Sequence, residues 1–256
     1  MRSAVASVFG ALVVLLSVSV SVSAQTAAPP PDSVTEVLRQ KARQGMQQEY
    51  EASRKKHMAW HKAQNDTWAW DVFEVTTGPD TGSYIIASGN HQWKEMEQWE
   101  AKMGDADTAD SRASMGGAID GTQRAYWTQL NSISRLPPPD ERQPLLTVTY
   151  YRVKPGSDAA LRAAIGKVNA ALDAGKFPLR TIWYVLSNGG AGPTYAVVAP
   201  RAGLGEMAPS PSLLEVLEKQ LGKPAADALA KSFFDNVVST NSEMLRRRTD
   251  LSYIPN

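Results

Sequence analysis

The sequence of 256 residues contains no cysteine. Disulfide bonds, thiol nucleophiles and thiolate metal ligands are therefore all excluded. The net charge of +1 provides no strong field of either sign. We therefore expect neither nucleic acid nor an anionic membrane as a partner, since both attract strongly basic proteins.

Long apolar runs are confined to the N-terminus. Arg2 precedes an uncharged apolar run, and small side chains at 22–24 match the pattern that a signal peptidase reads. The pattern predicts a signal peptide over residues 1–24, cleaved after Ala24, and a secreted or periplasmic product. An uncleaved anchor is the alternative, because about 18 apolar residues can just span a bilayer. Residues 25–32 are rich in proline and are expected to be disordered.

The rest of the chain contains an internal repeat. An offset of 111 residues aligns Tyr84 with Tyr195 and residues 95–96 with 206–207, both Glu-Met. Trp70 aligns with Trp183 at an offset of 113, and the segments 132–137 and 250–255 resemble each other at an offset of 118. Matches that keep their order over such a length indicate duplication. We predict repeats over 33–137 and 145–256, joined by a Pro-rich linker at 138–144.

Each repeat can be divided into elements by comparison with the other. The β-branched and aromatic segment 145–153 predicts a strand, and 33–42 is its counterpart although alone it resembles a helix. Helices are expected over 45–64 and 157–175. Hairpins follow at 67–89 and 180–200, and then helical regions, one of which begins at Ser212 with capping-box spacing to Glu215. Short strands at 131–136 and 250–254 are expected to close the repeats.

The order strand, helix, strand, strand, helix, strand is that of the ferredoxin-like unit. Its hairpin strands are apolar on both faces, since Trp183 and Val185 alternate with Ile182 and Tyr184. One layer of helices would leave one such face in water, so we predict an α+β fold in which two repeats pack sheet to sheet. This arrangement resembles the dimeric α+β barrel superfamily in a fused, tandem form.

The resemblance covers nearly the whole mature chain but rests on element order and duplication. Groups with this fold include antibiotic-biosynthesis-type monooxygenases, haem-degrading enzymes, chlorite-dismutase-like haem proteins and NIPSNAP proteins. The resemblance therefore implies a fold and leaves the function open. Haem is a cofactor that the resemblance allows, but no segment matches a haem-ligand motif. A homo-oligomer is also compatible with it.

All three histidines lie in the first repeat. Tyr50, Arg54, His57 and His61 align with Leu161, Ile165, Val168 and Leu172, which form the sheet-facing stripe of an amphipathic helix. We therefore predict a pocket between the first helix and the sheet of the first repeat. The proposed ligand-binding residues are His57, Trp60, His61, Trp68, Trp70, Asp71 and His91. Ordinary core packing of these histidines and tryptophans is the alternative.

The predicted function is binding of a small, largely apolar or aromatic molecule in that pocket. A cofactor-independent monooxygenase-type or haem-dependent enzyme is one alternative, in which Asp71 is a possible general base, and a protein-interaction module is another. No metal site is predicted, because the glutamate-bearing zinc signature is absent and Lys56 and Lys62 flank the histidine pair.

Overall fold

The structure is a computed structural model that describes residues 30–138, 141–208 and 211–255. The predicted signal peptide lies outside the described residues. Each repeat has the predicted order of elements. The first repeat contains β1 (Ser33–Ala42), α1 (Gln47–Ala63), β2 (Asp71–Val75), β3 (Tyr84–His91), α2 (Trp93–Trp99), a π-helical segment (Glu100–Gly104), α3 (Asp105–Met115) and β4 (Ile119–Gln129). The second contains β5 (Leu145–Val153), α4 (Asp158–Ala174), β6 (Ile182–Asn188), β7 (Thr194–Arg201), α5 (Leu213–Leu221), α6 (Lys223–Phe234) and β8 (Val237–Arg247).

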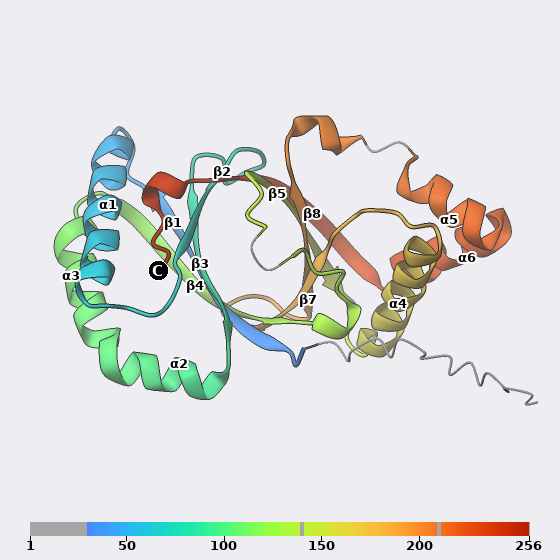
Figure 1. Cartoon of the computed structure of the whole chain (residues 1–256), viewed down its shortest axis with the longest axis horizontal. Coiled ribbons are helices and arrows are strands. Elements are labelled where there is room, and N and C mark those ends of the chain that lie inside the picture. Colours follow the sequence, from blue (N-terminus) through green and yellow to red (C-terminus); the bar gives the residue numbers. More distant parts are fainter. Residues whose placement is uncertain (1–29, 139–140, 209–210, 256) are drawn as a thin grey trace, which may run out of the picture.

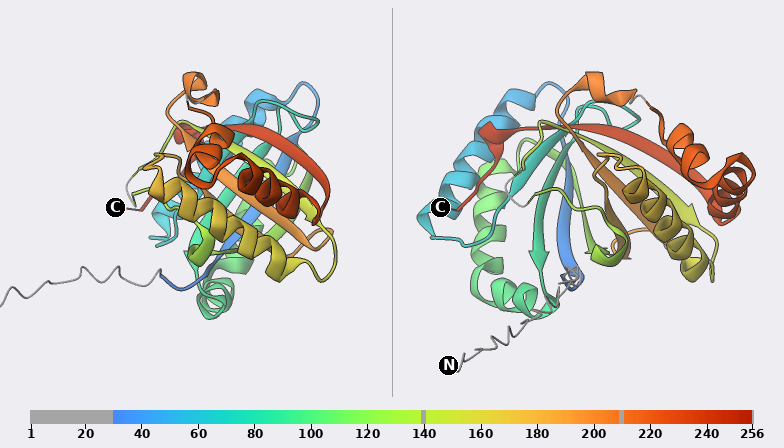
Figure 2. Two further views of the ribbon diagram at one scale, coloured as in Figure 1. Left: turned by 90° about the vertical axis from the view of Figure 1, so that its right-hand side faces the viewer. Right: turned by 45° about the vertical axis from the view of Figure 1, so that its right-hand side comes forward.

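The strands form one closed antiparallel barrel in the order β1-β3-β2-β8-β5-β7-β6-β4. Within it, each repeat keeps the strand order of a ferredoxin-like sheet. Helices α1 to α3 cover the outside of the first sheet, and α4 to α6 cover the outside of the second (Figure 1). Two further views show the same outer position of both helix groups (Figure 2). The predicted α+β barrel of two tandem repeats is confirmed.

Strand pairing demonstrates the duplication residue by residue. Val37 pairs with Ala87 in the first repeat, and Val148 pairs with Val198 in the second, each 111 residues further along the chain. The last strands follow the offset of 118, since Ala125 pairs with Val37 and Glu243 with Val148. Both offsets were predicted from the sequence.

The offset of 113 between Trp70 and Trp183 is wrong. Val72 pairs with Ile86, and Trp183 pairs with Val197, so Trp183 is the counterpart of Val72 at the common offset of 111. The error left the assignment of faces intact, because a shift of two residues along a strand returns the side chain to the same face.

The expected positions of the closing strands, 131–136 and 250–254, are also wrong, because β4 and β8 close the two repeats. Residues 131–133 and 249–251 form short 3-10 helices after β4 and β8. Each segment then crosses to the other repeat. Arg135 forms an isolated bridge with Thr181, and Tyr253 forms one with Trp70. The exchange buries Leu251 completely beside α1. The barrel therefore contains two segments swapped between its halves.

Three apolar layers explain why the hairpin strands are apolar on both faces. Tyr50, Val72 and Ile86 lie between the first sheet and its helices, and Leu161 and Trp183 occupy the equivalent layer of the second repeat. The third layer lies between the inner faces of the two sheets and includes Phe73, Ile85, Val148, Ala196 and Leu245. Ile182 and Tyr184 face this inner space, while Trp183 and Val185 face the helices, as the alternation predicted.

Capping residues in the sequence determine where α5 begins and ends. Ser212 accepts a hydrogen bond from the Glu215 backbone, and the Glu215 carboxylate accepts one from the Ser212 backbone, which confirms the capping box of α5. Gly222 ends that helix at a positive φ of 79°, a conformation that costs a residue with a Cβ.

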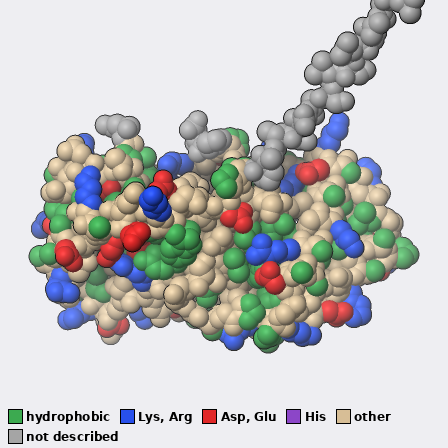
Figure 3. Space-filling model, turned by 90° about the horizontal axis from the view of Figure 1, so that it is seen from below, with side chains coloured by type: hydrophobic (Ala, Val, Ile, Leu, Met, Phe, Trp, Pro, Cys, Tyr) green, Lys and Arg blue, Asp and Glu red, His purple; other side chains and the backbone are tan. Residues whose placement is uncertain are grey.

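The surface carries no dominant charge. On the face shown in Figure 3, lysine and arginine side chains are interspersed with aspartate and glutamate. This mixture agrees with the net charge of +1. Within the described part of the chain, none of the helices combines the length and the apolar character that crossing a membrane requires.

The contact between Glu51 and Arg248 joins the two repeats. Arg248, just beyond β8, donates to both oxygens of Glu51 on α1, at 2.7 and 2.8 Å. The Tyr84 hydroxyl donates to the same carboxylate at 2.5 Å. The hydrogen bonds from Arg248, partly opposed by burial, lower the pKa of Glu51 from 4.5 to about 2.

We predict that Glu51→Gln lowers the free energy of unfolding at pH 7 by about 1 to 2 kcal/mol. Because folding lowers the pKa of Glu51, its contribution is complete above pH 4.5 and is lost as the pH falls through about 2. The difference in the free energy of unfolding between wild type and Glu51→Gln should therefore shrink as the pH falls from 4.5 to about 2. Urea unfolding at several pH values measures it, with the exposed Glu49→Gln as the control. A difference that is independent of pH would contradict the assignment.

Candidate functional site

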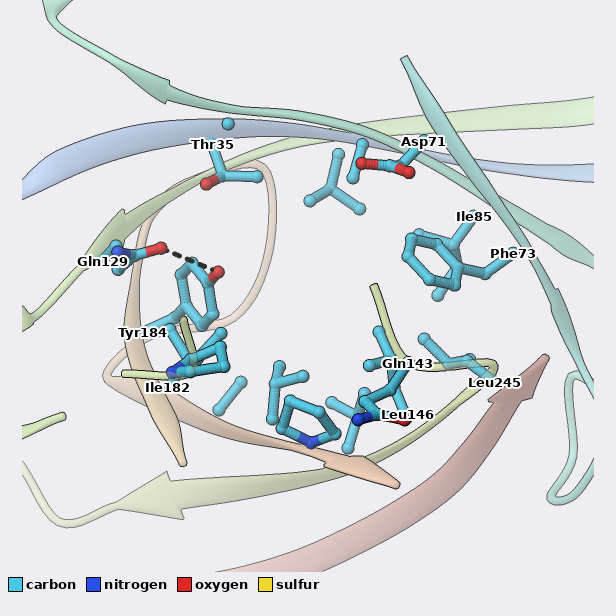
Figure 4. Close-up of a pocket in the computed structure, with 18 of the residues that line it drawn as sticks. Thr35, Asp71, Phe73, Ile85, Gln129, Gln143, Leu146, Ile182, Tyr184 and Leu245 are labelled. Carbon is cyan, nitrogen blue, oxygen red and sulfur yellow. Dashed lines mark hydrogen bonds between the residues drawn. The ribbon is translucent and has the colours of Figure 1, made fainter. Parts of the chain in front are cut away.

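The lumen of the barrel contains a cavity with a volume of about 580 Å³. Both repeats contribute its walls. The apolar lining includes Val37, Phe73, Ile85 and Trp127 from the first repeat, and Leu146, Val148, Ile182, Ala196 and Leu245 from the second. Figure 4 shows lining side chains, among them Phe73, Ile85, Leu146, Ile182 and Leu245, arranged around an open centre. The cavity is therefore mainly apolar and belongs to neither repeat alone.

One side of the lumen carries a small polar group of residues, Thr35, Gln129 and Tyr184 (Figure 4). The Tyr184 hydroxyl donates to Gln129 Oε1 at 3.0 Å. Burial raises the pKa of Tyr184 to about 12, so the phenol stays protonated at neutral pH. The buried Thr35 hydroxyl lies near the Tyr184 phenol but makes no hydrogen bond of ordinary geometry with any of the described residues. Buried hydroxyls are rarely left unpaired, so a polar atom of a ligand could bind here.

A buried ion pair borders the lumen beside Tyr150. The Tyr150 hydroxyl donates to Glu243 Oε1 at 2.7 Å, and Arg39 donates to both oxygens of Glu243 at 2.7 and 3.1 Å. Burial, together with the charge of Glu243, raises the pKa of Tyr150. These three side chains satisfy one another. We therefore assign them to closing the barrel and not to binding a ligand.

The linker between the repeats borders another part of the lumen. Pro138 and Gln143 line the cavity, and Figure 4 shows Gln143 at its edge. Arg142 donates to both oxygens of Asp71 at 2.9 and 2.8 Å, and Arg247 donates to the same carboxylate. Asp71 thus anchors the linker to the first sheet through Arg142 and contacts the end of β8 through Arg247.

A second cavity, of about 410 Å³, lies between the first sheet and helices α1 and α3. This is the region where the sequence predicted a ligand pocket. His57, His61 and Trp70 line it, and so do Arg54 and Asp107. This cavity is more polar than the lumen, because charged and titratable side chains from α1 and α3 line it.

Two histidines and one aspartate form a compact cluster on this second cavity. His57 Nε2 lies 3.2 Å and His61 Nε2 lies 3.3 Å from the same oxygen, Oδ1 of Asp107. Asp107 lies on α3, and both histidines lie on α1 one helical turn apart. Burial favours the neutral acid, but hydrogen bonds and charge from the two histidines hold the pKa of Asp107 well below its usual range.

Two further carboxylates contact the Nδ1 atoms of the His57 and His61 rings. His57 Nδ1 lies 2.7 Å from Asp110 Oδ2, and His61 Nδ1 lies 2.9 Å from Asp66 Oδ2. Burial opposes protonation of His61, yet hydrogen bonds and charge from Asp107 and Asp66 outweigh it and raise the pKa of His61.

Asp66 is the buried anchor of this arrangement. Besides His61, its carboxylate accepts the backbone N–H of Trp68 at 3.1 Å and the indole N–H groups of Trp70 and Trp99 at 3.0 Å each. Burial opposes its ionisation, but these hydrogen bonds lower the pKa of Asp66. The carboxylate therefore fixes the orientation of the His61 ring and of the tryptophans around it.

The predicted site residues are divided among three places. His57, His61 and Trp70 meet at the second cavity, whereas Asp71 lies at the lumen. His91 stacks on Trp68 with ring centroids 3.6 Å apart, and its Nε2 contacts Ser88 Oγ at 2.8 Å. Trp60 is half-buried and stacks beside His57 with ring centroids 5.8 Å apart. These last three line neither cavity.

Asp107 could not be identified from the sequence, because it lies on another helix far along the chain from His61. The one available signal was the spacing of Asp107 and Asp110 on a predicted helical region, which places both carboxylates on one face. The lumen was missed for a different reason. It consists of ordinary strand residues that differ in no way from core residues until the two sheets are placed together.

Histidine-ligated haem fits neither cavity as the side chains lie. No histidine lines the lumen. In the second cavity, Asp107 is within 3.3 Å of both Nε2 atoms, so its carboxylate occupies the space through which a porphyrin iron would approach. Neither cavity therefore presents a histidine ligand for haem.

Comparisons with known proteins agree on the fold. No protein-family model matches the sequence, and no curated protein matches it either. A candidate monooxygenase from Lactobacillus acidophilus has 8% identity and a TM-score of 0.55, covering 88% of this chain and 98% of that one. Chlorite dismutase from Candidatus Nitrospira defluvii has 8% identity and a TM-score of 0.51, with 85% and 92% covered. An anthrone oxidase-like protein has 15% identity and a TM-score of 0.50, with 85% and 94% covered.

These similarities extend over nearly the whole of each solved chain. The chain therefore shares the dimeric α+β barrel fold, in the tandem form that the sequence predicted. At such low identity they carry no residue-level assignment.

We predict that Asp66→Asn lowers the free energy of unfolding by about 3 to 5 kcal/mol, as breaking one partner of a buried ion pair does. The new amide nitrogen is itself a donor and would face one of the donors that the carboxylate accepts. Urea unfolding at pH 7 measures the effect, and near-UV circular dichroism reports the tryptophan environment. Asp105→Asn, an exposed position on α3, is the control. A loss equal to that of the control would show that Asp66 anchors nothing.

Proposed function

We propose that the barrel lumen binds one small, largely apolar molecule. The observation that carries the proposal is the cavity of about 580 Å³ between the two sheets. Protein interiors are close-packed, and voids larger than a water molecule are few. Pockets for small molecules commonly measure about 300 to 1,000 Å³ and are lined mostly by apolar and aromatic side chains. The lumen has both properties.

The polar group at one side of the lumen would orient the molecule. The hydroxyl of Thr35 can donate a hydrogen bond to the molecule, and the phenol oxygen of Tyr184, whose proton goes to Gln129, can accept one. Gln129 in turn donates to Asn131 and so fixes the position of the phenol. A carbonyl or hydroxyl group on the ligand would satisfy the unpaired Thr35 hydroxyl. Phe73, Trp127 and the other apolar walls would contact the rest of the molecule.

The proposal keeps the class of ligand that the sequence predicted but assigns it to a different cavity. The cavity beside His57 and His61 is lined by charged groups, and an apolar molecule there would remove these groups from water without offering them hydrogen bonds. In the lumen, an apolar molecule contacts apolar walls and replaces only water. The energetic preference for the lumen follows from this difference.

Export of the mature chain is part of the proposal and rests on the sequence of residues 1–24. A monooxygenase-type reaction, a haem-dependent enzyme and a protein-interaction module stay as alternatives, because the similarity to a candidate monooxygenase is one of fold. A homo-oligomer likewise stays a prediction.

We predict that N-phenyl-1-naphthylamine, a neutral aromatic fluorophore, binds to the mature chain and that Ala87→Phe weakens its binding at least about tenfold. Ala87 lines the lumen, so a phenyl group there would occupy space that the probe needs. The increase in probe fluorescence and the quenching of Trp127, a residue of the lumen wall, both measure binding.

Ser111→Phe is the matched control, because Ser111 lines only the second cavity. This control should bind the probe as wild type does. Thermal unfolding of both variants identifies any loss of folding. Weaker binding in Ser111→Phe together with unchanged binding in Ala87→Phe would contradict the proposal and move the ligand to the histidine pocket.

A further inference from the structure

The cluster of His57, His61 and Asp107 has the composition of a three-ligand metal centre. Each residue offers one ligand atom, and these atoms lie within 4.8 Å of one another. Two imidazoles and one carboxylate are a common protein ligand set for zinc and for other first-row transition metals. No comparable group occurs among the described residues of the second repeat, where leucine, isoleucine and valine stand at the aligned positions of α4.

The hydrogen bonds behind the histidines match those of metal ligands. A histidine that binds a metal usually donates its other ring N–H to a carboxylate or a carbonyl. Here Asp110 holds Nδ1 of His57, and Asp66 holds Nδ1 of His61. Both Nε2 atoms then face the same oxygen of Asp107. The rings are thus oriented in advance, with their remaining nitrogens directed at one point.

The charges also suit a dication. Three carboxylates, those of Asp66, Asp107 and Asp110, surround the two imidazoles, so acidic groups outnumber the histidines at this point. The lysines that argued against a metal in the sequence, Lys56 and Lys62, are both exposed and lie outside the cavity lining.

Arg54 provides an independent indication of a ligand. Its side chain is buried, with the residue 2% exposed, and it lines the same cavity. Its guanidinium donates to Gln40 Oε1, but its Nε atom has no hydrogen-bond partner among the described residues. A buried cation that lacks a full set of partners is costly. An anionic oxygen would complete its contacts.

We propose that His57, His61 and Asp107 bind one divalent transition-metal ion of the zinc class, and that Arg54 receives an anionic oxygen ligand beside its open coordination position. The cavity of about 410 Å³ provides the space for that ligand. This site is separate from the lumen and does not depend on the proposed apolar ligand. It predicts an anionic second ligand, carboxylate or phosphate, which the lumen would not accept.

The first test uses the mature chain after removal of metals with a chelator. Added Co²⁺ should bind in a ratio of one per chain and produce the intense visible absorption of a low-coordinate cobalt site, and Zn²⁺ should abolish that absorption by displacement. If the wild-type chain gives no such absorption and isothermal titration calorimetry detects no Zn²⁺ binding, the cluster is an ion-pair network alone and the proposal is overturned.

Variants locate the site. Asp107→Asn and His61→Gln should lose the cobalt absorption, while Asp110→Asn, which alters only the support of His57, should weaken binding about 10- to 100-fold. His91→Gln is the matched control, since His91 is also buried but lies outside the cluster, and it should bind as wild type does. If Asp107→Asn and His61→Gln fail to fold, the metal affinity of Asp110→Asn is the deciding measurement. Wild-type affinity in that variant would overturn the assignment.

A last experiment tests Arg54. Acetate or inorganic phosphate, added to the cobalt-loaded chain, should shift its visible spectrum. In Arg54→Met the cobalt absorption should remain and the response to both anions should be at least about tenfold weaker. An unchanged response in that variant, or no response in wild type to either anion, would overturn the role of Arg54 while leaving the metal site to the preceding tests.

Discussion

Backbone hydrogen bonds at two seams determine the architecture. An isolated ferredoxin-like sheet has two edge strands with unpaired N–H and C=O groups. Here β2 pairs with β8 and β4 pairs with β6, so each repeat satisfies both edges of the other. Closure brings the inner faces together without any further strand. The lumen exists because these seams hold the sheets in a closed barrel whose inner side chains do not fill it.

The duplication allowed the two halves to diverge on the outer face of the sheets. In the second repeat, α4 presents Leu161, Ile165 and Leu172 to its sheet, and that layer is an ordinary apolar core. In the first repeat the same stripe of α1 carries Arg54 and two histidines. Such a polar layer is stable because both histidines are paired with carboxylates and Asp66 accepts four hydrogen bonds. One half thus has an apolar core at this position, while the other has a layer of polar and titratable groups.

Much of the fold could be predicted because the repeat provided two aligned sequences for each helix and strand. Residues 33–42 resemble a helix alone, and their alignment with 145–153 identified the strand β1. The sheet-facing position of His57 and His61 also followed from their apolar counterparts. Features that depend on the approach of distant segments were not predictable. Asp107 reaches the histidines only through the packing of α3 on α1, and the lumen appears only when both sheets are closed.

The swapped closing segments make the two repeats one cooperative unit. Leu251 and Tyr253 come from the end of the chain, yet they pack inside the first repeat, where the Tyr253 hydroxyl donates to the Asp66 carbonyl at 2.7 Å. Residues 130–135 serve the second repeat in the same way. Neither half, expressed alone, would contain the segment that seals its own core. Removing even the last few residues would therefore delete Tyr253, whose ring stacks on His61, although β8, the last strand of the barrel, would remain complete.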